Sequence, residues 1–432
     1  MTPRVTGLLS FAAIPVFFAL KVGSALVLLT ASTAWLPVAG FAEFTQLLIL
    51  AALLNLIAIG GAQNGIVRMT ASASAAEEIG RTRGAALAIW LAVMLVGGLL
   101  GVLLRTQLST VLVGDAHAAT AAMAVVLLTL AGGPGQIFTS MLTGRGRSTA
   151  ALSAQGCGLV AGLLGALYML RLGDAGGAAI AFAAGPLVTM AVAWLRLRGE
   201  RLSGASFARL GQEVRTLLAF SASMIAMTAF ASVILFGLRY VYQEAFGLQT
   251  LGLWLAASRI SDTTTQFLGL ILLQLFVPRY VTLEEPHAAV RLVLLTWLAG
   301  LAVMASFLAV FATAPQFLVR LFLSPDYLPA IGGILLYMAG DTLRVWAALA
   351  MNVQLARGRP WRYALIEMGT LTLMAGLTLA GIAMREPRAP MLAYVAAYGF
   401  TALLVTVWFA RGRIARARAM PRPALGPGEA VL

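Results

Sequence analysis

The sequence predicts an all-α polytopic membrane protein with twelve transmembrane helices, arranged as two sets of six. Three observations predict this fold class: the composition, the number of long apolar segments, and the distribution of arginine along the chain. Of the 432 residues, 60% are hydrophobic and 11% are charged, whereas about a quarter of the residues in a soluble domain are charged. The chain is therefore too apolar to form an ordinary soluble domain.

The apolar segments give the number of helices, because a helix that crosses the hydrocarbon core needs about 20 mostly apolar residues. No cleavable signal peptide is expected, since the first segment is long and contains Lys21. The outer connections are short, which argues against an enzyme with a large catalytic loop, such as a polymerase or glycosyltransferase. Four tryptophans near predicted span ends are expected to form an aromatic belt: Trp35, Trp254, Trp361 and Trp408. The predicted spans are 8–36, 44–66, 84–104, 118–143, 149–170, 177–195, 216–238, 250–277, 290–314, 328–355, 362–383 and 390–410.

The distribution of arginine predicts the orientation, because cationic residues concentrate in cytoplasmic loops. With both termini placed in the cytoplasm, most of the 30 cationic residues fall in inner segments. The net charge of +14 then indicates contact with anionic membrane lipids, and no nucleic acid partner is expected. The cations expected on the outer face are Arg105, Arg171, Arg239, Arg320, Arg385 and Arg388.

The longest basic connection divides the chain into two halves. "NGIVRM" (64–69) and "LFVPRY" (275–280) end related spans with an arginine, and "GRGRS" and "ARGRP" repeat this at nearly the same offset. A duplication explains the repeats, although short basic loops resemble one another without one. Parallel six-helix repeats place a substrate site between the halves, near the midplane. The expected parts are an N-terminal bundle 1–195, a cytoplasmic basic linker 196–215, a C-terminal bundle 216–410 and a cytoplasmic basic tail 411–432.

Five ionisable residues fall well inside predicted spans: Lys21, Arg259, Asp262, Asp341 and Arg344. Each costs about 2.5–3.5 kcal/mol to insert, and such residues usually face a water-filled cavity or a charged partner. The two Arg/Asp pairs are spaced three residues apart and so partly neutralise themselves. One interpretation is that they only help helices dock. The other is a cavity with surplus positive charge, which suits an anionic substrate.

Lys21 favours the cavity, because its own helix holds no acidic partner and the residue falls near the midplane. In "LWLAASRISDTTTQF" (253–267), Asp262 and Gln266 share one helix face with several hydroxyl groups, and Arg259 lies at its edge. Arginine binds phosphate with two parallel hydrogen bonds, and lysine acts as a point charge. The predicted substrate-binding residues are Lys21, Arg259, Asp262, Gln266, Asp341 and Arg344.

A few sequence features bear on the energy source of transport and on conformational change. No phosphate-binding Gly-Lys-Ser/Thr loop is present, so coupling to a proton or sodium gradient through Asp262, Asp341 or Glu367 is the alternative to ATP. Pro134 in "LAGGPGQIF" predicts a kink, which acts as a hinge or as a passive packing feature. A single cysteine and two distant histidines predict neither a disulfide nor a metal site, and no cofactor is expected.

Two of these segments resemble a known family. "GLWLAASRISDTTTQFLGLILLQLFVPRY" (252–280) is similar to the eighth-helix signature of Wzx-type flippases, and "VAGFAEFTQLLILAALLNLIAIGGAQNGIVRMTA" (38–71) also resembles that family. The resemblance is greatest to the lipid III flippase and O-antigen translocase subgroup. It implies the multidrug/oligosaccharidyl-lipid/polysaccharide exporter (MOP) superfamily, whose fold is two six-helix bundles that form a V around a central cavity.

The resemblance also implies a function. Wzx-type flippases move undecaprenyl-diphosphate-linked oligosaccharide repeat units, of O-antigen or a similar polysaccharide, to the periplasmic leaflet of the bacterial inner membrane. A polysaccharide polymerase and a chain-length regulator are the protein partners that it implies. The main alternative is a cation-coupled multidrug or small-molecule antiporter of the same fold. A lipid scramblase is another, but it has no need of intramembrane cations.

Overall fold

The computed structural model describes residues 3–59, 62–73, 75–107, 110, 119–198, 210–271, 276, 286–356 and 360–419. The elements in this part of the chain are helices. The N-terminal half contains α1 (Pro3–Trp35), α2 (Val38–Ile57), α3 (Gln63–Ser72), α4 (Ala76–Leu103), α6 (Ala119–Ala131), α7 (Gly133–Gly144), α8 (Ser148–Arg171), α9 (Ala175–Ala183) and α10 (Gly185–Arg198). The C-terminal half contains α11 (Leu210–Ile271), α13 (Pro286–Thr313), α14 (Pro315–Phe322), the short 3₁₀ helix η3 (Pro325–Ala330), α15 (Ile331–Ala356), α16 (Pro360–Ala383) and α17 (Ala389–Ala419).

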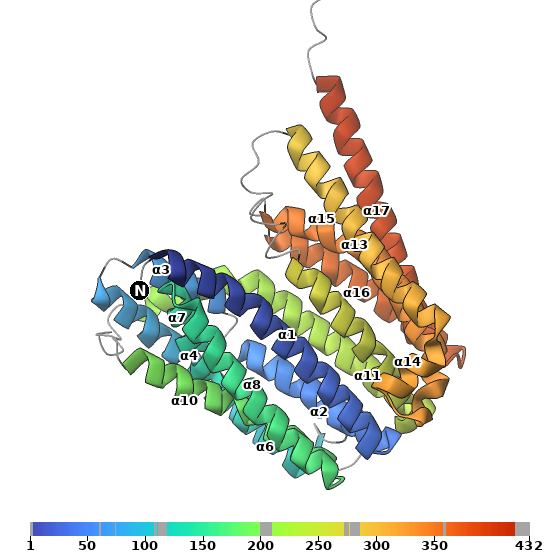
Figure 1. Cartoon of the computed structure of the whole chain (residues 1–432), viewed down its shortest axis with the longest axis horizontal. Coiled ribbons are helices and arrows are strands. Elements are labelled where there is room, and N and C mark those ends of the chain that lie inside the picture. Colours follow the sequence, from blue (N-terminus) through green and yellow to red (C-terminus); the bar gives the residue numbers. More distant parts are fainter. Residues whose placement is uncertain are drawn as a thin grey trace, which may run out of the picture.

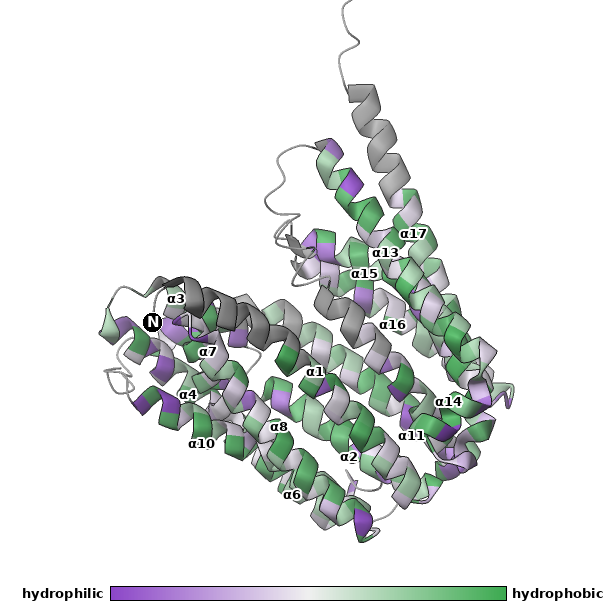
Figure 2. Ribbon diagram, in the orientation of Figure 1, coloured by the Kyte–Doolittle hydropathy of each residue, from purple (hydrophilic) through white to green (hydrophobic). Residues whose placement is uncertain are grey.

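Nine helical segments within the described residues are long and apolar enough to cross a membrane. The other three predicted spans, 8–36, 216–238 and the described part of 250–277, fall on α1 and on the long helix α11. In Figure 2, hydrophobic residues predominate along the helices, while the most hydrophilic residues lie mainly near helix ends. Most of the linker 196–215, the segment 277–280 and the end of the tail lie outside the described residues.

Helix α11 consists of two segments that meet at Gly247. This glycine has φ +83°, a conformation that disfavours any residue with a Cβ atom. The first segment continues past the predicted span end because Leu238 and Tyr242 are buried in the C-terminal core, where the Tyr242 hydroxyl donates to the Pro387 carbonyl at 2.7 Å. The placement of Arg239 in an outer connection was therefore wrong: this residue is helical and buried.

Two interrupted helices of the N-terminal half pack together at their interruptions. One break lies at Gly132 between α6 and α7, with Pro134 in the first turn of α7, and the other lies between α9 and α10. A Cβ atom added to Gly135 would lie only 3.0 Å from the backbone nitrogen of Met190 on α10. The absence of a Cβ atom at Gly135 thus allows the helices to approach closely beside the break, and the role of Pro134 as a hinge stays a prediction.

The helices form two groups that meet at one end and diverge toward the other (Figure 1). Helix α11 contacts α2, and α14 contacts α1, across the two groups. The Thr30 hydroxyl donates to the Phe322 carbonyl at 3.1 Å, and a Cβ atom on Gly252 would lie 2.6 Å from the Val38 carbonyl oxygen. The groups are therefore closely packed at the end where α1 finishes and α2 begins.

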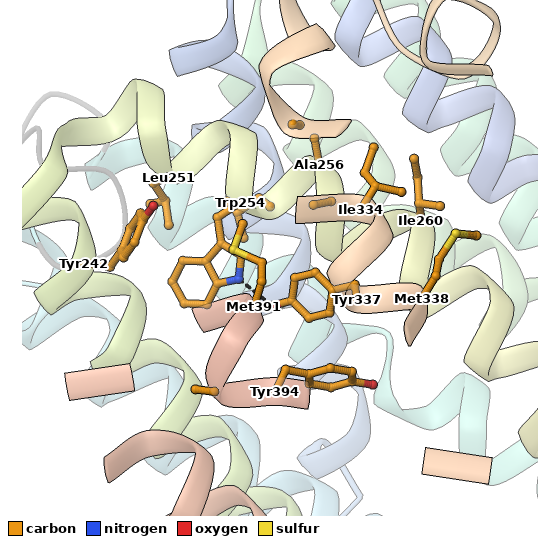
Figure 3. Close-up of a cluster of buried hydrophobic side chains, with 14 of the residues drawn as sticks. Tyr242, Leu251, Trp254, Ala256, Ile260, Ile334, Tyr337, Met338, Met391 and Tyr394 are labelled. Carbon is orange, nitrogen blue, oxygen red and sulfur yellow. Dashed lines mark hydrogen bonds between the residues drawn. The ribbon is translucent and has the colours of Figure 1, made fainter. Parts of the chain in front are cut away.

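The core of the C-terminal half includes aromatic residues from several helices (Figure 3). The Trp254 indole is buried and donates to the Tyr337 hydroxyl at 2.6 Å, while its ring packs against Tyr242. The expectation that Trp254 lies in an aromatic belt was therefore wrong, because its side chain is buried in this core. Trp35, Trp361 and Trp408 are exposed on the protein surface.

Candidate functional site

A cavity of about 280 Å³ lies between the two halves. Its walls come from α1, α2 and the second segment of α11, with single residues from α8 and α9. Lys21, Arg259 and Asp262 all line it. Three of the six predicted substrate-binding residues, which come from the first and eighth predicted spans, thus share one cavity.

The charges of this cavity do not neutralise one another directly. Lys21 is exposed, and within the described chain it forms no ion pair. The Arg259 guanidinium donates to the Thr45 carbonyl at 3.5 Å, which connects α11 to α2. Arg259 and Asp262 form no salt bridge in the part of the chain that the structure describes, although the Asp262 carboxylate stays within electrostatic range of the Arg259 guanidinium. Two cations and one carboxylate therefore leave surplus positive charge on the cavity wall.

Ser24 adds an unsatisfied hydroxyl to the same wall. It lies three residues after Lys21 on α1, is buried, and has no hydrogen-bond partner among the described residues. Buried polar groups nearly always have a partner, so an exception inside a cavity indicates a place for a ligand or water. Ser24 could not be recognised from the sequence, because a serine in an apolar helix usually forms a hydrogen bond to its own backbone.

Arg239 is a further cation that the sequence analysis did not place near the site. It lies on the first segment of α11, is 9% exposed, and stays within electrostatic range of Arg259 and Asp262. Its Nε and Nη1 atoms have no hydrogen-bond partner in the described structure. The guanidinium lies 5.8 Å from the ring centroid of Phe236, so it has an aromatic contact. Arg239 increases the positive charge of this region without lining the cavity.

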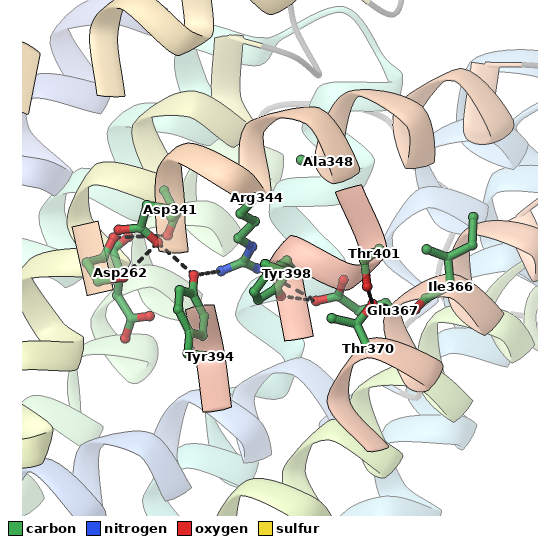
Figure 4. A network of polar contacts seen from close by, with 12 residues as sticks. Asp262, Asp341, Arg344, Ala348, Ile366, Glu367, Thr370, Tyr394, Tyr398 and Thr401 are labelled. Carbon is green, nitrogen blue, oxygen red and sulfur yellow. Dashed lines mark hydrogen bonds and ion pairs between the residues drawn. The ribbon is translucent and has the colours of Figure 1, made fainter. Parts of the chain in front are cut away.

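A separate polar network fills the interior of the C-terminal half (Figure 4). Asp341 on α15 is 1% exposed and accepts hydrogen bonds from the Ser261 hydroxyl at 2.9 Å and the Tyr394 hydroxyl at 2.6 Å. The Tyr394 hydroxyl in turn accepts a hydrogen bond from Arg344 Nη1 at 3.3 Å. The network therefore connects α11, α15 and α17.

The network continues from Arg344 to α16. Arg344 Nη2 lies 3.7 Å from Glu367 Oε1, and the same oxygen accepts a hydrogen bond from the Tyr398 hydroxyl at 3.3 Å. The Arg344 guanidinium also stacks 5.0 Å from the Tyr398 ring centroid. Arg344 thus has a carboxylate, a hydroxyl and an aromatic face as partners, all of them from α16 and α17.

The predicted site residues therefore separate into two groups. Asp341 and Arg344 were grouped with the cavity, but they do not line it, because tyrosines and Glu367 of neighbouring helices hold them in the network. The side chain of Gln266 lies outside the described residues. Tyr394 and Tyr398 were not among the predicted site residues; their four-residue spacing within an apolar span is the signal that would have placed them on one helix face.

Comparisons with known proteins identify the fold. No protein-family model matches the chain, and no curated protein matches it. Among solved structures, an inward-facing multidrug resistance MATE family transporter of the MOP superfamily matches with a TM-score of 0.67 and 16% identity, over 94% of this chain and 96% of that one. The lipid II flippase MurJ in an inward closed conformation matches with a TM-score of 0.69 and 12% identity, over 94% and 87%.

A third solved structure, a MOP superfamily transporter from Pyrococcus furiosus, matches with a TM-score of 0.60 and 16% identity, over 93% of this chain and 94% of that one. These matches cover nearly the whole chain. The protein is therefore an all-helical, multi-pass membrane protein with the MOP fold, and the expectation of this fold is confirmed.

Proposed function

We propose that the protein is a flippase for undecaprenyl-diphosphate-linked oligosaccharide repeat units, of O-antigen or a similar surface polysaccharide. The observation that carries the proposal is the cavity wall, where Lys21 and Arg259 lack ion-pair partners in the described chain. A substrate with a diphosphate supplies the missing negative charge, and Arg259 has the geometry to bind two of its oxygens. The similarity of the fold to both MurJ and MATE transporters supports a transporter.

The size of the cavity indicates which part of the substrate it holds. About 280 Å³ falls below the range of about 300–1,000 Å³ that is usual for drug-sized ligands. We assign it to the diphosphate, with the Ser24 hydroxyl as a further donor. The sugars extend toward the end where the halves diverge, and Asp262 and Gln266 are the residues that we propose for binding their hydroxyl groups. The lipid tail remains in the bilayer.

Transport then follows by alternating access. With both termini in the cytoplasm of a bacterial cell, the diverging end faces the cytoplasm, and the end packed around Gly252 faces the periplasm. Rocking of the halves opens the Gly252 end and closes the other, and bending at Pro134 assists it. Asp262, Asp341 and Glu367 are the carboxylates that we propose for coupling to a proton or sodium gradient. A flipping assay with and without an ionophore tests that coupling.

A multidrug or small-molecule antiporter is the second candidate. The specific observation in its favour is Asp341, a buried carboxylate in the C-terminal half of a chain whose fold matches MATE transporters. This candidate predicts drug sensitivity on deletion of the gene and unchanged surface glycan.

The deciding experiment is a gene deletion in the native host, with surface polysaccharide and lipid-linked intermediates both quantified. The deletion is complemented with wild type, Lys21→Ala, Arg259→Ala and, as a matched control, Arg171→Ala. Arg171 is an exposed cation in the last turn of α8, away from the cavity.

A flippase gives loss of surface glycan and accumulation of lipid-linked repeat units in the deletion. Wild type and Arg171→Ala restore the glycan, whereas the two cavity variants reach normal membrane abundance and fail to restore it. Full rescue by both cavity variants contradicts the diphosphate site. Unchanged glycan together with new drug sensitivity supports the antiporter instead.

A further inference from the structure

A second and larger cavity lies within the C-terminal half. It measures about 570 Å³ and is a groove along α16 and α17, with Gln354 of α15 in its wall at the end where α16 begins. Its volume falls in the range of about 300–1,000 Å³ that is usual for ligand sites. Its described lining shares no residue with the cavity between the halves, so it is a separate site.

The groove has an unpartnered polar group in its wall. Gln354 is 1% exposed, and neither its amide nitrogen nor its amide oxygen has a hydrogen-bond partner in the described structure. By contrast, the two buried threonines of the groove, Thr370 and Thr401, form a hydrogen bond with each other, with their hydroxyl oxygens 2.8 Å apart. Buried amides are rarely left without a partner. Gln354 therefore indicates a ligand that donates to it or accepts from it.

The two ends of the groove differ in polarity. Arg362, in the first turn of α16, and Trp408 on α17 lie at one end, and both are exposed. Leu365, Phe400 and Leu404 form apolar walls that are also exposed on the surface of the protein. The groove therefore has a cationic mouth and an apolar body, which fits an anionic head group attached to a hydrocarbon chain.

The length of the groove indicates what kind of hydrocarbon chain it can hold. Along α16 its lining runs from Arg362 to Leu373, which is about 16 Å at 1.5 Å per residue. The hydrocarbon core of a bilayer is about 30 Å thick, so one leaflet contributes about 15 Å. Both α16 and α17 are long and apolar enough to cross the membrane. The groove thus matches the depth of a single leaflet and runs in the direction of its acyl chains.

We propose that this groove binds one anionic phospholipid from the leaflet next to Arg362. The lipid phosphate lies between the Arg362 guanidinium and the Gln354 amide, and one acyl chain follows α16 past Gly369 to Leu373. Arg362 gives the site its preference for an anionic head group over a zwitterionic one, because it supplies a cation at the mouth.

Gly369 provides a direct way to fill the groove. A Cβ atom added at this position meets nothing within 4 Å, so a large side chain enters the groove without displacing the backbone. Gly376 is a matched control, because it lies two turns further along the same helix, is equally open, and does not line the groove.

The test is native mass spectrometry of the purified full-length protein. Wild type, Gly369→Trp, Gly376→Trp and Arg362→Gln are each titrated with phosphatidylglycerol, phosphatidylcholine or undecaprenyl phosphate, and inorganic phosphate serves as the lipid-free probe. We expect wild type to hold one phosphatidylglycerol about tenfold more tightly than phosphatidylcholine. Gly369→Trp loses this adduct and Gly376→Trp keeps it, while Arg362→Gln binds the two phospholipids equally.

Equal binding of both phospholipids by wild type, or an unchanged adduct in Gly369→Trp, overturns the proposal. Selective retention of undecaprenyl phosphate, displaced by Gly369→Trp, also overturns it and identifies the substrate lipid as the occupant. Binding of inorganic phosphate alone removes the role of the acyl chain. The readout is lipid binding, so it does not depend on whether the protein is a flippase.

Discussion

Arg259 and Asp262 on α11 and Asp341 and Arg344 on α15 are the same two residue types at the same spacing, yet the structure gives them opposite surroundings. The α11 pair lines the cavity between the halves, and neither side chain has an ion-pair partner in the described chain. The α15 pair lies in the network, where Tyr394 and Glu367 supply hydrogen bonds and an ion pair. A spacing of three residues therefore does not decide whether charges pair.

The two regions differ in whether their charged side chains still need a partner from outside the protein. A charge that faces a cavity keeps water as its partner until a ligand replaces it, so its removal costs binding more than stability. A charge inside a completed network is already satisfied, so removing one member leaves another buried without its partner. The cavity is thus suited to an anionic substrate, whereas the network is suited to holding α11, α15, α16 and α17 in one arrangement.

The largest expected effect comes from substituting the two arginines in parallel. Arg259→Met removes a charge-assisted contact with the substrate, worth about 1.5–3 kcal/mol, and lowers the transport rate by about 10- to 100-fold. Its unfolding free energy changes little, because Arg259→Met removes only one long hydrogen bond, to the Thr45 carbonyl at 3.5 Å, and no ion pair of the described structure. Arg344→Met shows the opposite pattern, with reduced stability. Flipping assays and chemical unfolding of the same two purified variants check this, and equal loss of stability in both removes the distinction between the regions.

A smaller effect is expected within the network itself. Either Arg344→Met or Glu367→Gln lowers the unfolding free energy by about 2 kcal/mol. This is below the about 3–5 kcal/mol of a fully buried pair, because the Arg344 side chain is 30% exposed. The double variant is expected to lose less than the sum of the two single variants, since no charge is then left without its partner. Additive losses in the double-mutant cycle show that the two residues act independently.

Much of the fold could be predicted from local properties of the sequence. Apolar length and arginine placement follow from the hydrocarbon core and the charged lipid surface, so they need no tertiary information. Arg239 was missed because its burial depends on how the first segment of α11 packs through Leu238 and Tyr242. The extension of that helix to Gly247 is a tertiary effect, and an apolar-length criterion ends the span too early.

Part of the candidate site could also be predicted from local properties of the sequence. The cost of a charge inside a membrane singled out Lys21, Arg259 and Asp262, and the structure places all three in one cavity. That reasoning did not separate Asp341 and Arg344 from them, because it weighs each charge alone. The partners that hold Asp341 and Arg344 come from three other helices: Ser261 from α11, Glu367 from α16 and Tyr394 from α17.

The smallest expected effect compares two neighbours on α11 that face different regions. Ser261 donates to Asp341 in the network, while the Thr263 hydroxyl bonds to its own helix at the Arg259 carbonyl and lines the cavity. Ser261→Ala is expected to lower the unfolding free energy by about 1 kcal/mol, since Asp341 loses one donor and keeps the Tyr394 hydroxyl. Thr263→Val preserves the shape of the side chain and removes only a local hydrogen bond, so its stability changes by less than about 0.5 kcal/mol. Chemical unfolding of the two variants measures the difference. If Thr263→Val loses as much unfolding free energy as Ser261→Ala, the two faces of α11 contribute equally to stability and the distinction fails.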